Sequence, residues 1–226
     1  MRSRAIVLDL DDTLYRERRF ALSGYKAVAA SVEEQFGIDR DTAFKCMTLS
    51  MRRGRRQAAF QDLATRFRLS ESDSASWLAC YRSHQPCLRL RRSVRESLEA
   101  LRRTWRIGLL TNGLPSVQAA KVAALGLSDL VDSITYADAF GGKPHASAFL
   151  EILSRLGIDA GHAVFAGDDE RRDIEGAGRV GMKTVLVDRR GTAWGAAVRA
   201  DAIVRDVTEV PVVAGRLLGG ECEDVH

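Results

Sequence analysis

The feature that most constrains this chain is a short apolar segment followed at once by a cluster of carboxylates. Residues 5–8, Ala-Ile-Val-Leu, have the pattern of a buried strand. Asp9, Asp11 and Asp12 follow within four residues, at the strand end where a parallel sheet usually carries its active site. Carboxylates this close repel one another unless a cation or a proton neutralises them. The segment therefore predicts a metal site, a shared proton, or both.

The rest of the chain divides into a helical part and an alternating part. Residues 18–85 show helical spacing of apolar residues and no strand-like alternation, which favours a bundle of four or five helices. From residue 93 onward, short apolar segments alternate with amphipathic ones, so we expect a parallel sheet with helices on both faces. Strands are expected at 106–110, 133–136, 163–166, 183–187 and 202–204, with helices at 93–104, 116–125, 146–156, 172–180 and 209–218.

Within the helical part, local signals place the helix ends. Gly37 is expected to end the first helix, and Asp39 or Asp41 to cap a second that runs to about residue 53. A third helix is expected at 58–67 and a fourth at 74–83.

Four short segments carry polar residues in a fixed order. The first follows the predicted strand at residues 5–8, and the other three lie in the alternating part. The four segments are Asp9-x-Asp11-x-Thr13, Thr111-Asn112-Gly113, Lys143-Pro144 and Gly167-Asp168 with Asp173 five residues on. In this order they resemble the motifs of the haloacid dehalogenase-like (HAD) hydrolase superfamily, whose members are mostly phosphatases. The resemblance covers about residues 1–15 and 92–210. It implies an α/β fold, a doubly wound, Rossmann-like parallel sheet, with an inserted α-helical cap domain.

The resemblance also implies domain boundaries. Residues 1–15 and 92–226 would form the catalytic core, and residues 16–91, directly after the catalytic strand, would form the helical cap.

The first motif is expected to supply the two catalytic residues. As nucleophile, the Asp9 carboxylate would attack phosphorus and give an aspartyl-phosphate, dividing one difficult displacement into two easier ones. Asp11 would protonate the leaving alcohol and later activate water. The alternatives are an Asp9 that caps the following loop and an Asp11 that contributes only charge. Asp12 is expected to cap the local turn.

The acidic residues predict the metal. Hard oxygen ligands with no His or Cys nearby favour Mg²⁺ over Zn²⁺. Asp9 and Asp168 are expected to bind it directly, and the resemblance implies the same for the backbone carbonyl of Asp11. Asp173 is expected either to bind the metal or to hold Lys143 or a metal-bound water.

The phosphate is expected to meet Thr111, Asn112 and Lys143. Thr111 follows a strand, so its hydroxyl and the next N–H groups can bind phosphate oxygens, although Asn112 and Gly113 could equally form a plain turn. A lone lysine is usually a solvated surface residue. In the order of the motifs, however, Lys143 would neutralise the nucleophile and the transferred phosphoryl group.

Charge gives weaker information about partners. The net charge is +4, with 29 arginines against five lysines. The cluster at residues 52–56 could neutralise nucleic-acid phosphates, lie on a solvated helix face, or attract a small anionic substrate. We expect a small phosphorylated metabolite and no nucleic acid, and the candidates for substrate specificity are Arg52, Arg53, Arg55 and Arg56, with Tyr25 and His84 also in the cap. The oligomeric state stays open.

Other features indicate where the protein is located and argue against a dinucleotide cofactor. The sequence has no apolar run of about 18 residues and no secretion signal, so we expect no membrane span and a cytoplasmic protein. Cys46, Cys80, Cys87 and Cys222 lack metal-binding spacing and are expected to be free thiols. Residues 176–181 fit Gly-x-Gly-x-x-Gly. They precede the predicted strand instead of following one, however, so a dinucleotide site is not expected.

Together these patterns predict a Mg²⁺-dependent phosphatase. Alternatives within the superfamily are a phosphomutase, a phosphonate hydrolase using Lys26 or Lys45, and a 2-haloacid dehalogenase, which typically lacks an aspartate at the position of Asp11. A non-catalytic, phosphate-accepting signalling domain would share the acidic cluster, but it would be shorter and lack the helical insert.

Overall fold

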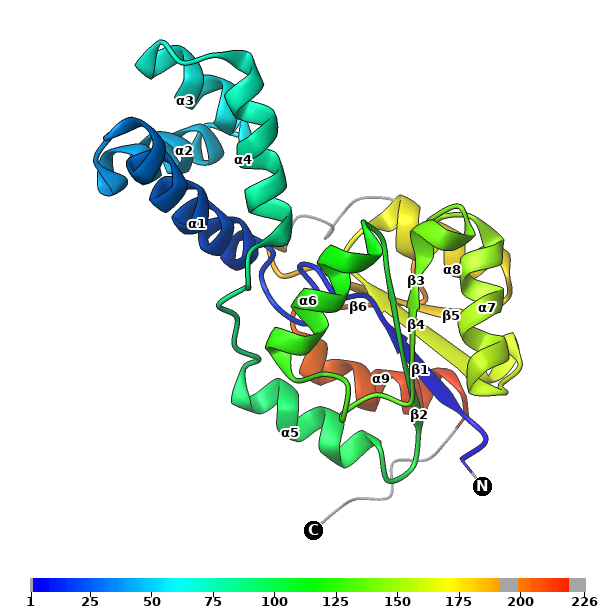
Figure 1. Cartoon of the computed structure of the whole chain (residues 1–226). Coiled ribbons are helices and arrows are strands. Elements are labelled where there is room, and N and C mark those ends of the chain that lie inside the picture. The colour runs from blue at the N-terminus through cyan, green and yellow to red at the C-terminus, as the bar shows by residue number, and fades with distance from the viewer. Residues whose placement is uncertain (1, 192–198, 220–226) are drawn as a thin grey trace. The chain divides into compact units, whose positions relative to one another are not determined.

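The computed structural model describes residues 2–191 and 199–219 (Figure 1). The chain separates into two compact units. Met1–Arg16 and Arg89–His226 make up one, the sheet unit, and Glu17–Leu88 the other, the helical unit.

The sheet unit is built on six strands. They are β1 (Ala5–Leu8), β2 (Arg106–Thr111), β3 (Ser133–Tyr136), β4 (Ala163–Gly167), β5 (Lys183–Val187) and β6 (Ala202–Val204). Their order across the sheet is β3-β2-β1-β4-β5-β6, and every neighbouring pair is parallel. The strand order reverses direction beside β1, which makes the carboxyl end of β1 the expected position of a ligand site. The predicted doubly wound α/β sheet is confirmed.

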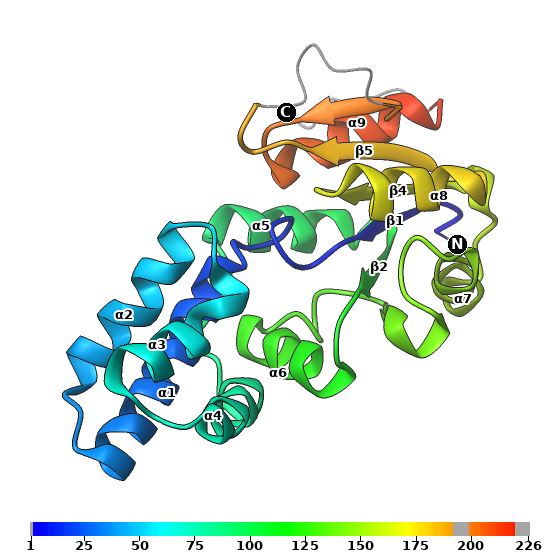
Figure 2. The same cartoon turned by 90° about the horizontal axis from the view of Figure 1, so that it is seen from above.

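Helices cover both faces of this sheet, as Figure 2 shows from above. They are α5 (Arg92–Leu101), α6 (Pro115–Leu125), α7 (Ala146–Leu156), α8 (Gly176–Arg179) and α9 (Val210–Leu217). Because side chains alternate along a strand, β1 serves both layers. Val7 belongs to the core formed with Phe149 of α7, whereas Leu8 faces Val94 of α5 and Val210 of α9.

The helical unit consists of α1 (Arg18–Phe36), α2 (Arg40–Arg52), α3 (Ala59–Phe67) and α4 (Glu71–Ser83). Gly37 ends α1 with φ 67°, and the Asp39 side chain accepts a hydrogen bond from the Thr42 N–H at the start of α2. The four helices enclose an apolar core of their own, which includes Tyr25, Met47 and Trp77. Short 3₁₀ turns lie at Arg56–Ala58 here and at Ala137–Phe140, Ala160–His162 and Val207–Glu209 in the sheet unit.

Three predicted helices differ from their expected bounds by more than a residue, and the one expected at 93–104, α5, ends at Leu101. α4 begins at Glu71 and not at residue 74, because Ser70 and Asp73 form a capping box at its N-terminus. The helix expected at 172–180 begins instead as a π-helical turn, Glu170–Glu175, which continues into α8. The Asp169 carboxylate accepts the N–H groups of Arg171 and Arg172, and this cap starts the turn early.

The remaining expectations concern glycines and cysteines. Gly176 and Gly178 lie in α8, which leads into β5, so the Gly-x-Gly-x-x-Gly segment does not follow a strand, as predicted. Cys46, Cys80 and Cys87 are free thiols, while Cys222 lies outside the described residues. Over the described residues, no helix has both the length and the apolar character needed to cross a bilayer.

Candidate active site

The site forms where the central strands of the sheet end. β1 lies between β2 and β4 in parallel register, with Leu8 opposite both Leu109 and Ala166. The Asp9 N–H continues the ladder by donating to the Ala166 carbonyl at 2.9 Å. The sheet therefore brings the first, second and fourth motifs, far apart in sequence, to one edge.

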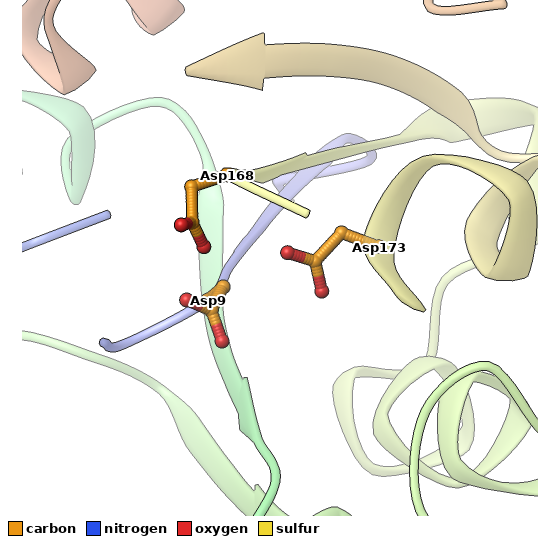
Figure 3. A group of neighbouring side chains, drawn as sticks. All are labelled: Asp9, Asp168 and Asp173. Atoms are coloured by element: carbon orange, nitrogen blue, oxygen red, sulfur yellow. The ribbon is translucent and has the colours of Figure 1, made fainter. Parts of the chain in front are cut away.

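Three carboxylates gather at this edge (Figure 3). Asp9, Asp168 and Asp173 each offer one oxygen, and these oxygens all lie within 4.8 Å of one another. Asp9 and Asp173 are buried and Asp168 is exposed, so the cluster opens to solvent on the side of Asp168. The sequence placed Asp9 and Asp168 among the metal ligands, and the fold brings them together.

Lys143 is the buried cation of this cluster. Its Nζ lies 2.6 Å from Asp9 Oδ1 and 2.7 Å from Asp173 Oδ1, and its side chain is 3% exposed. Burial alone would lower the pKa of Lys143, but the attraction of Asp173 and Asp9 outweighs burial and raises that pKa. Lys143 is therefore held as an ammonium between the two carboxylates.

One ammonium does not balance three carboxylates. Burial raises the pKa of Asp9 to about 8, with the charge of Asp173 adding to the effect and Lys143 opposing it. Burial also raises the pKa of Asp168 to about 7, reinforced by Asp173 and Asp12. Asp9 is buried, so its shift reflects negative charge in a desolvated place, whereas Asp168 is exposed and neighbouring carboxylates add to the rise of its pKa. Since all the donors are hard oxygens, the cluster fits Mg²⁺.

The local backbone aims Asp173 at the cluster. Gly167 ends β4, and a Cβ built there would lie 2.2 Å from Asp173 Oδ2, so only glycine leaves room for this carboxylate. Asp173 Oδ2 also accepts the Asp169 N–H at 3.2 Å. Both oxygens of Asp173 are thus engaged, one by Lys143 and one by the backbone. The Asp169 side chain caps the π-helical turn.

Asn112 holds the backbone of Lys143. The Lys143 N–H donates to Asn112 Oδ1 at 2.8 Å, and Asn112 Nδ2 donates to the Lys143 carbonyl at 3.1 Å. Gly141 and Gly142 turn the chain just before, with φ values of 85° and 75° that favour glycine. The side chain of Asn112 therefore positions Lys143, and a phosphate contact of Asn112 stays a prediction.

Thr111 ends β2 and is 1% exposed. Its hydroxyl lies 3.5 Å from the Asn112 carbonyl, a distance too long for a strong hydrogen bond. The Gly113 N–H, one of the groups predicted to meet phosphate, donates instead to Asp138 Oδ1 at 2.8 Å. Phosphate binding by Thr111 also stays a prediction.

Asp11 has a separate environment. Lys121 Nζ donates to its Oδ1 at 2.9 Å and to its Oδ2 at 2.7 Å, and the Tyr15 hydroxyl donates to Oδ1 at 2.5 Å. Gln118 Nε2 lies 3.3 Å from Oδ2. Sequence reasoning missed Gln118 and Lys121, although polar residues three apart on a helix share one face. Asp12 has φ 57°, a left-handed turn conformation that aspartate tolerates.

The arginines singled out in the helical unit differ from one another. Arg52 and Arg53 are exposed, and Arg55 pairs with Asp62. Arg56 makes two hydrogen bonds to Glu17, at 2.5 and 2.9 Å, and one to the Tyr81 hydroxyl at 3.2 Å.

Of these four arginines, Arg56 is the one that lines a groove of about 540 Å³ within the helical unit. The other lining residues are Tyr25, Gln57, Phe60, Gln61, Ser74, Ala75, Leu78 and Tyr81. His84 instead bonds the Tyr81 carbonyl through Nδ1 at 2.7 Å.

Comparisons with known proteins show which family this chain is similar to. The family model of the haloacid dehalogenase-like hydrolases matches residues 3–181. The chain is 31% identical over 191 residues to the glyceraldehyde 3-phosphate phosphatase of Pyrococcus abyssi, covering 80% of each protein. Among solved structures, the HAD phosphatase of Thermococcus onnurineus is 27% identical with a TM-score of 0.63, over 96% of this chain and 99% of that one. The 2-haloacid dehalogenase of Pseudomonas syringae is 26% identical with a TM-score of 0.64, over 94% and 98%.

The family model spans well over half of the sequence, and the Pyrococcus abyssi relative matches the chain along 80% of its own length. The chain therefore belongs to the haloacid dehalogenase-like hydrolase family, as an enzyme of its phosphatase class.

Proposed function

We propose that this protein is a Mg²⁺-dependent phosphatase that hydrolyses a small phosphorylated metabolite through an aspartyl-phosphate intermediate. The observation that carries the proposal is the buried Lys143, which forms ion pairs with Asp9 and Asp173 beside Asp168. This arrangement provides a nucleophilic carboxylate, a fixed cation and an excess of oxygen ligands in one place. A reaction in which negative charge develops next to a bound cation would use all three groups.

In the first step, an oxygen of Asp9 attacks phosphorus, the new O–P bond forms, and the bond from phosphorus to the leaving alcohol breaks. Lys143 stabilises the negative charge that accumulates on the transferred phosphoryl group, since its ammonium is already fixed beside Asp9. Asp11 gives its proton to the departing oxygen. In the second step, Asp11 takes a proton from water as the water attacks phosphorus, and Asp9 is released with inorganic phosphate.

Asp9, Asp168 and the backbone carbonyl of Asp11 would hold Mg²⁺. When bound, the ion would supply positive charge against the phosphoryl oxygens and favour ionised Asp9. The engagement of both Asp173 oxygens by Lys143 and the Asp169 N–H supports the alternative in which Asp173 positions Lys143.

The substrate class is supported by a relative. The Pyrococcus abyssi relative is named for a three-carbon phosphate ester, which favours a small metabolite.

Phosphate release tests this function. The purified protein would be supplied with Mg²⁺ and a panel of phosphorylated sugars, hydroxy acids and amino acids, with Asp9→Asn as the matched inactive control. We expect release of phosphate from at least one small ester by the natural chain and none by the variant. Release of halide from 2-chloropropionate in excess chelator, without phosphatase activity, would establish the dehalogenase alternative.

Acceptor dependence tests the mutase alternative. A phosphatase passes the phosphoryl group to water, so product phosphate should equal substrate consumed. A phosphomutase would yield a rearranged sugar phosphate and almost no free phosphate. A phosphonate hydrolase would cleave a C–P substrate and lose that activity in Lys26→Met or Lys45→Met.

A further inference from the structure

The carboxylate of Asp11 is held by three side chains, which we call the Asp11 clasp: Tyr15, Gln118 and Lys121. Oδ1 accepts from Lys121 and Tyr15, and Oδ2 accepts from Lys121 and Gln118. An ionised carboxylate offers about four lone-pair positions, and the clasp supplies four donor contacts. The acceptor capacity of Asp11 is therefore filled from within the sheet unit.

Lys121 is the charged centre of the clasp. The residue is 2% exposed, and its Nζ contacts both oxygens of Asp11, at 2.7 and 2.9 Å. A lysine this buried is rarely found without a charged partner, because an isolated ammonium is costly to desolvate. The position of Lys121 on α6 is thus tied to that of Asp11, 110 residues earlier in the chain.

Gln118 connects the clasp to the second motif. Its Nε2 donates to the Asn112 carbonyl at 2.6 Å and to Asp11 Oδ2 at 3.3 Å. A Cβ at Gly113 would lie 2.6 Å from this nitrogen, and Gly113 has φ 119°, so glycine is needed for the close approach. One amide group therefore bridges Asp11 and the backbone that also fixes Lys143 through Asn112.

This arrangement has a chemical consequence. A carboxylate whose oxygens already accept four hydrogen bonds has no free position for a water or a leaving oxygen. For Asp11 to exchange a proton with a substrate, at least one donor of the clasp must release it. We propose that Lys121 is a positioning residue for the proposed reaction, and that with Gln118 it holds Asp11 in a standby orientation and governs its release toward the reacting oxygen.

This inference rests on the phosphatase function proposed above, and it goes beyond the motifs, which assign no role to α6. A purely structural Lys121 would behave differently. Removing one partner of a buried ion pair leaves the other charge uncompensated and destabilises the fold, so the loss of a purely structural Lys121 would act on folding and not selectively on proton transfer. Kinetic measurements on Lys121 variants therefore distinguish a positioning role from a purely structural one.

The test is a double-mutant cycle in the full chain. Lys121→Met removes the charge and keeps most of the side-chain volume, Lys121→Arg keeps the charge, and Asp11→Asn removes the proton-transfer group. Each would be made alone, and Lys121→Met would be combined with Asp11→Asn. Lys183→Met serves as the matched control, because Lys183 also pairs with an aspartate, Asp201, but begins β5 at the opposite end of the sheet.

With an alkyl phosphate, we expect Lys121→Met to lower kcat by about 10- to 100-fold, up to the lower end of the range of about 10²- to 10⁴-fold for general acid–base catalysis, and to leave KM within about twofold. With 4-nitrophenyl phosphate, whose leaving group needs no proton, the loss should be several-fold smaller. When Asp11→Asn is already present, adding Lys121→Met should lower kcat by less than about a further twofold. Lys121→Arg should recover part of the loss, and Lys183→Met should match the natural chain.

Equal losses on both substrates, or equal losses with and without Asp11, would overturn the inference. Urea unfolding of the same proteins gives a readout independent of turnover. Non-additive midpoints for the Asp11 and Lys121 changes support the clasp, and additive midpoints contradict it. If the natural chain releases no phosphate at all, the proposed function fails, and the unfolding cycle still decides whether the clasp exists.

Discussion

The two aspartates of the first motif lie two residues apart, yet the balance of charge around them differs. Asp9 shares Lys143 with Asp173 and lies beside a third carboxylate, so its region carries more negative than positive charge. Asp11 is paired with Lys121, and two neutral donors, Tyr15 and Gln118, contact it in addition. The first region is incomplete without a further cation, whereas the second is balanced as it stands. Removing Mg²⁺, the proposed further cation, should therefore disturb the surroundings of Asp9 far more than those of Asp11.

The largest effect is expected at the nucleophile. Asp9→Asn replaces an attacking carboxylate with an amide, so turnover of any phosphate ester should fall by at least about 10⁴-fold, because the covalent route is lost. Rapid quench and mass spectrometry should find added phosphate on the peptide carrying Asp9 in the natural chain and none in the variant. Phosphate on another residue would contradict the proposed mechanism.

Asp11→Asn should have a smaller and more selective effect. General acid–base help is worth about 10²- to 10⁴-fold, and the loss should approach that range with alkyl phosphates and be much less with an aryl phosphate. The phosphoenzyme should also accumulate, since hydrolysis lacks its base. A uniform loss across leaving groups would place Asp11 among groups that act on structure or binding.

Metal dependence should separate the two regions next. Chelation should remove activity and added Mg²⁺ should restore it, while Asp168→Asn should raise the Mg²⁺ concentration for half-maximal activity by about tenfold or more, since the proposed direct ligand is lost. Lys121→Met should leave that concentration unchanged within about twofold. Equal shifts in both variants would erase the distinction between the regions.

The smallest expected effect concerns the stability of the metal-free protein. The pKa of Asp9 is raised to about 8 and that of Asp168 to about 7, well above their unfolded values, so the folded state binds more protons between those limits. Stability supplied by these protons is present below about pH 4 and lost as pH rises through 7 and 8. The unfolding temperature without metal should fall by a few degrees from pH 5 to 8. Added Mg²⁺ should raise the unfolding temperature most at pH 8.

Asp9→Asn is the control for this pH effect, because an amide does not titrate. Its unfolding temperature should vary less over the same interval. The carboxylates with lowered pKa values, including Asp132 and Asp206, lose their contribution only at more acidic pH, so they do not obscure the comparison. A natural chain that gains stability from pH 5 to 8 without metal would contradict the charge imbalance at Asp9.

Local patterns in the sequence were enough to predict the sheet. The six strands lie where the apolar segments placed them, to within a residue at each end, because a buried parallel strand needs a continuous apolar run. The ordered motifs also predicted which segments meet at the carboxyl edge. The start of α4 was missed because Ser70 and Ser74 both suit an N-cap, and only the reciprocal bond with Asp73 distinguishes them.

The parts that could not be predicted depend on contacts between distant residues. Lys121 and Gln118 look like the polar face of an ordinary helix, and only the packing of α6 against the first motif shows that they bind Asp11. Asn112 was expected to meet phosphate, yet its side chain is committed to the backbone of Lys143. The pairing of Arg56 with Glu17 likewise spans 39 residues, and the arginine cluster alone did not distinguish Arg56 from its neighbours.

A residue with no side chain bears on how this enzyme tolerates change. A single methyl group at Gly167 would collide with the Asp173 carboxylate, which in turn holds Lys143. Gly161, six residues earlier, has nothing within 4 Å of the same added atom. In a library of random substitutions screened for activity, position 167 should therefore be as intolerant as the aspartates, while position 161 accepts alanine freely. The most vulnerable positions of the site include one that performs no chemistry, and its contribution is the volume that it leaves empty.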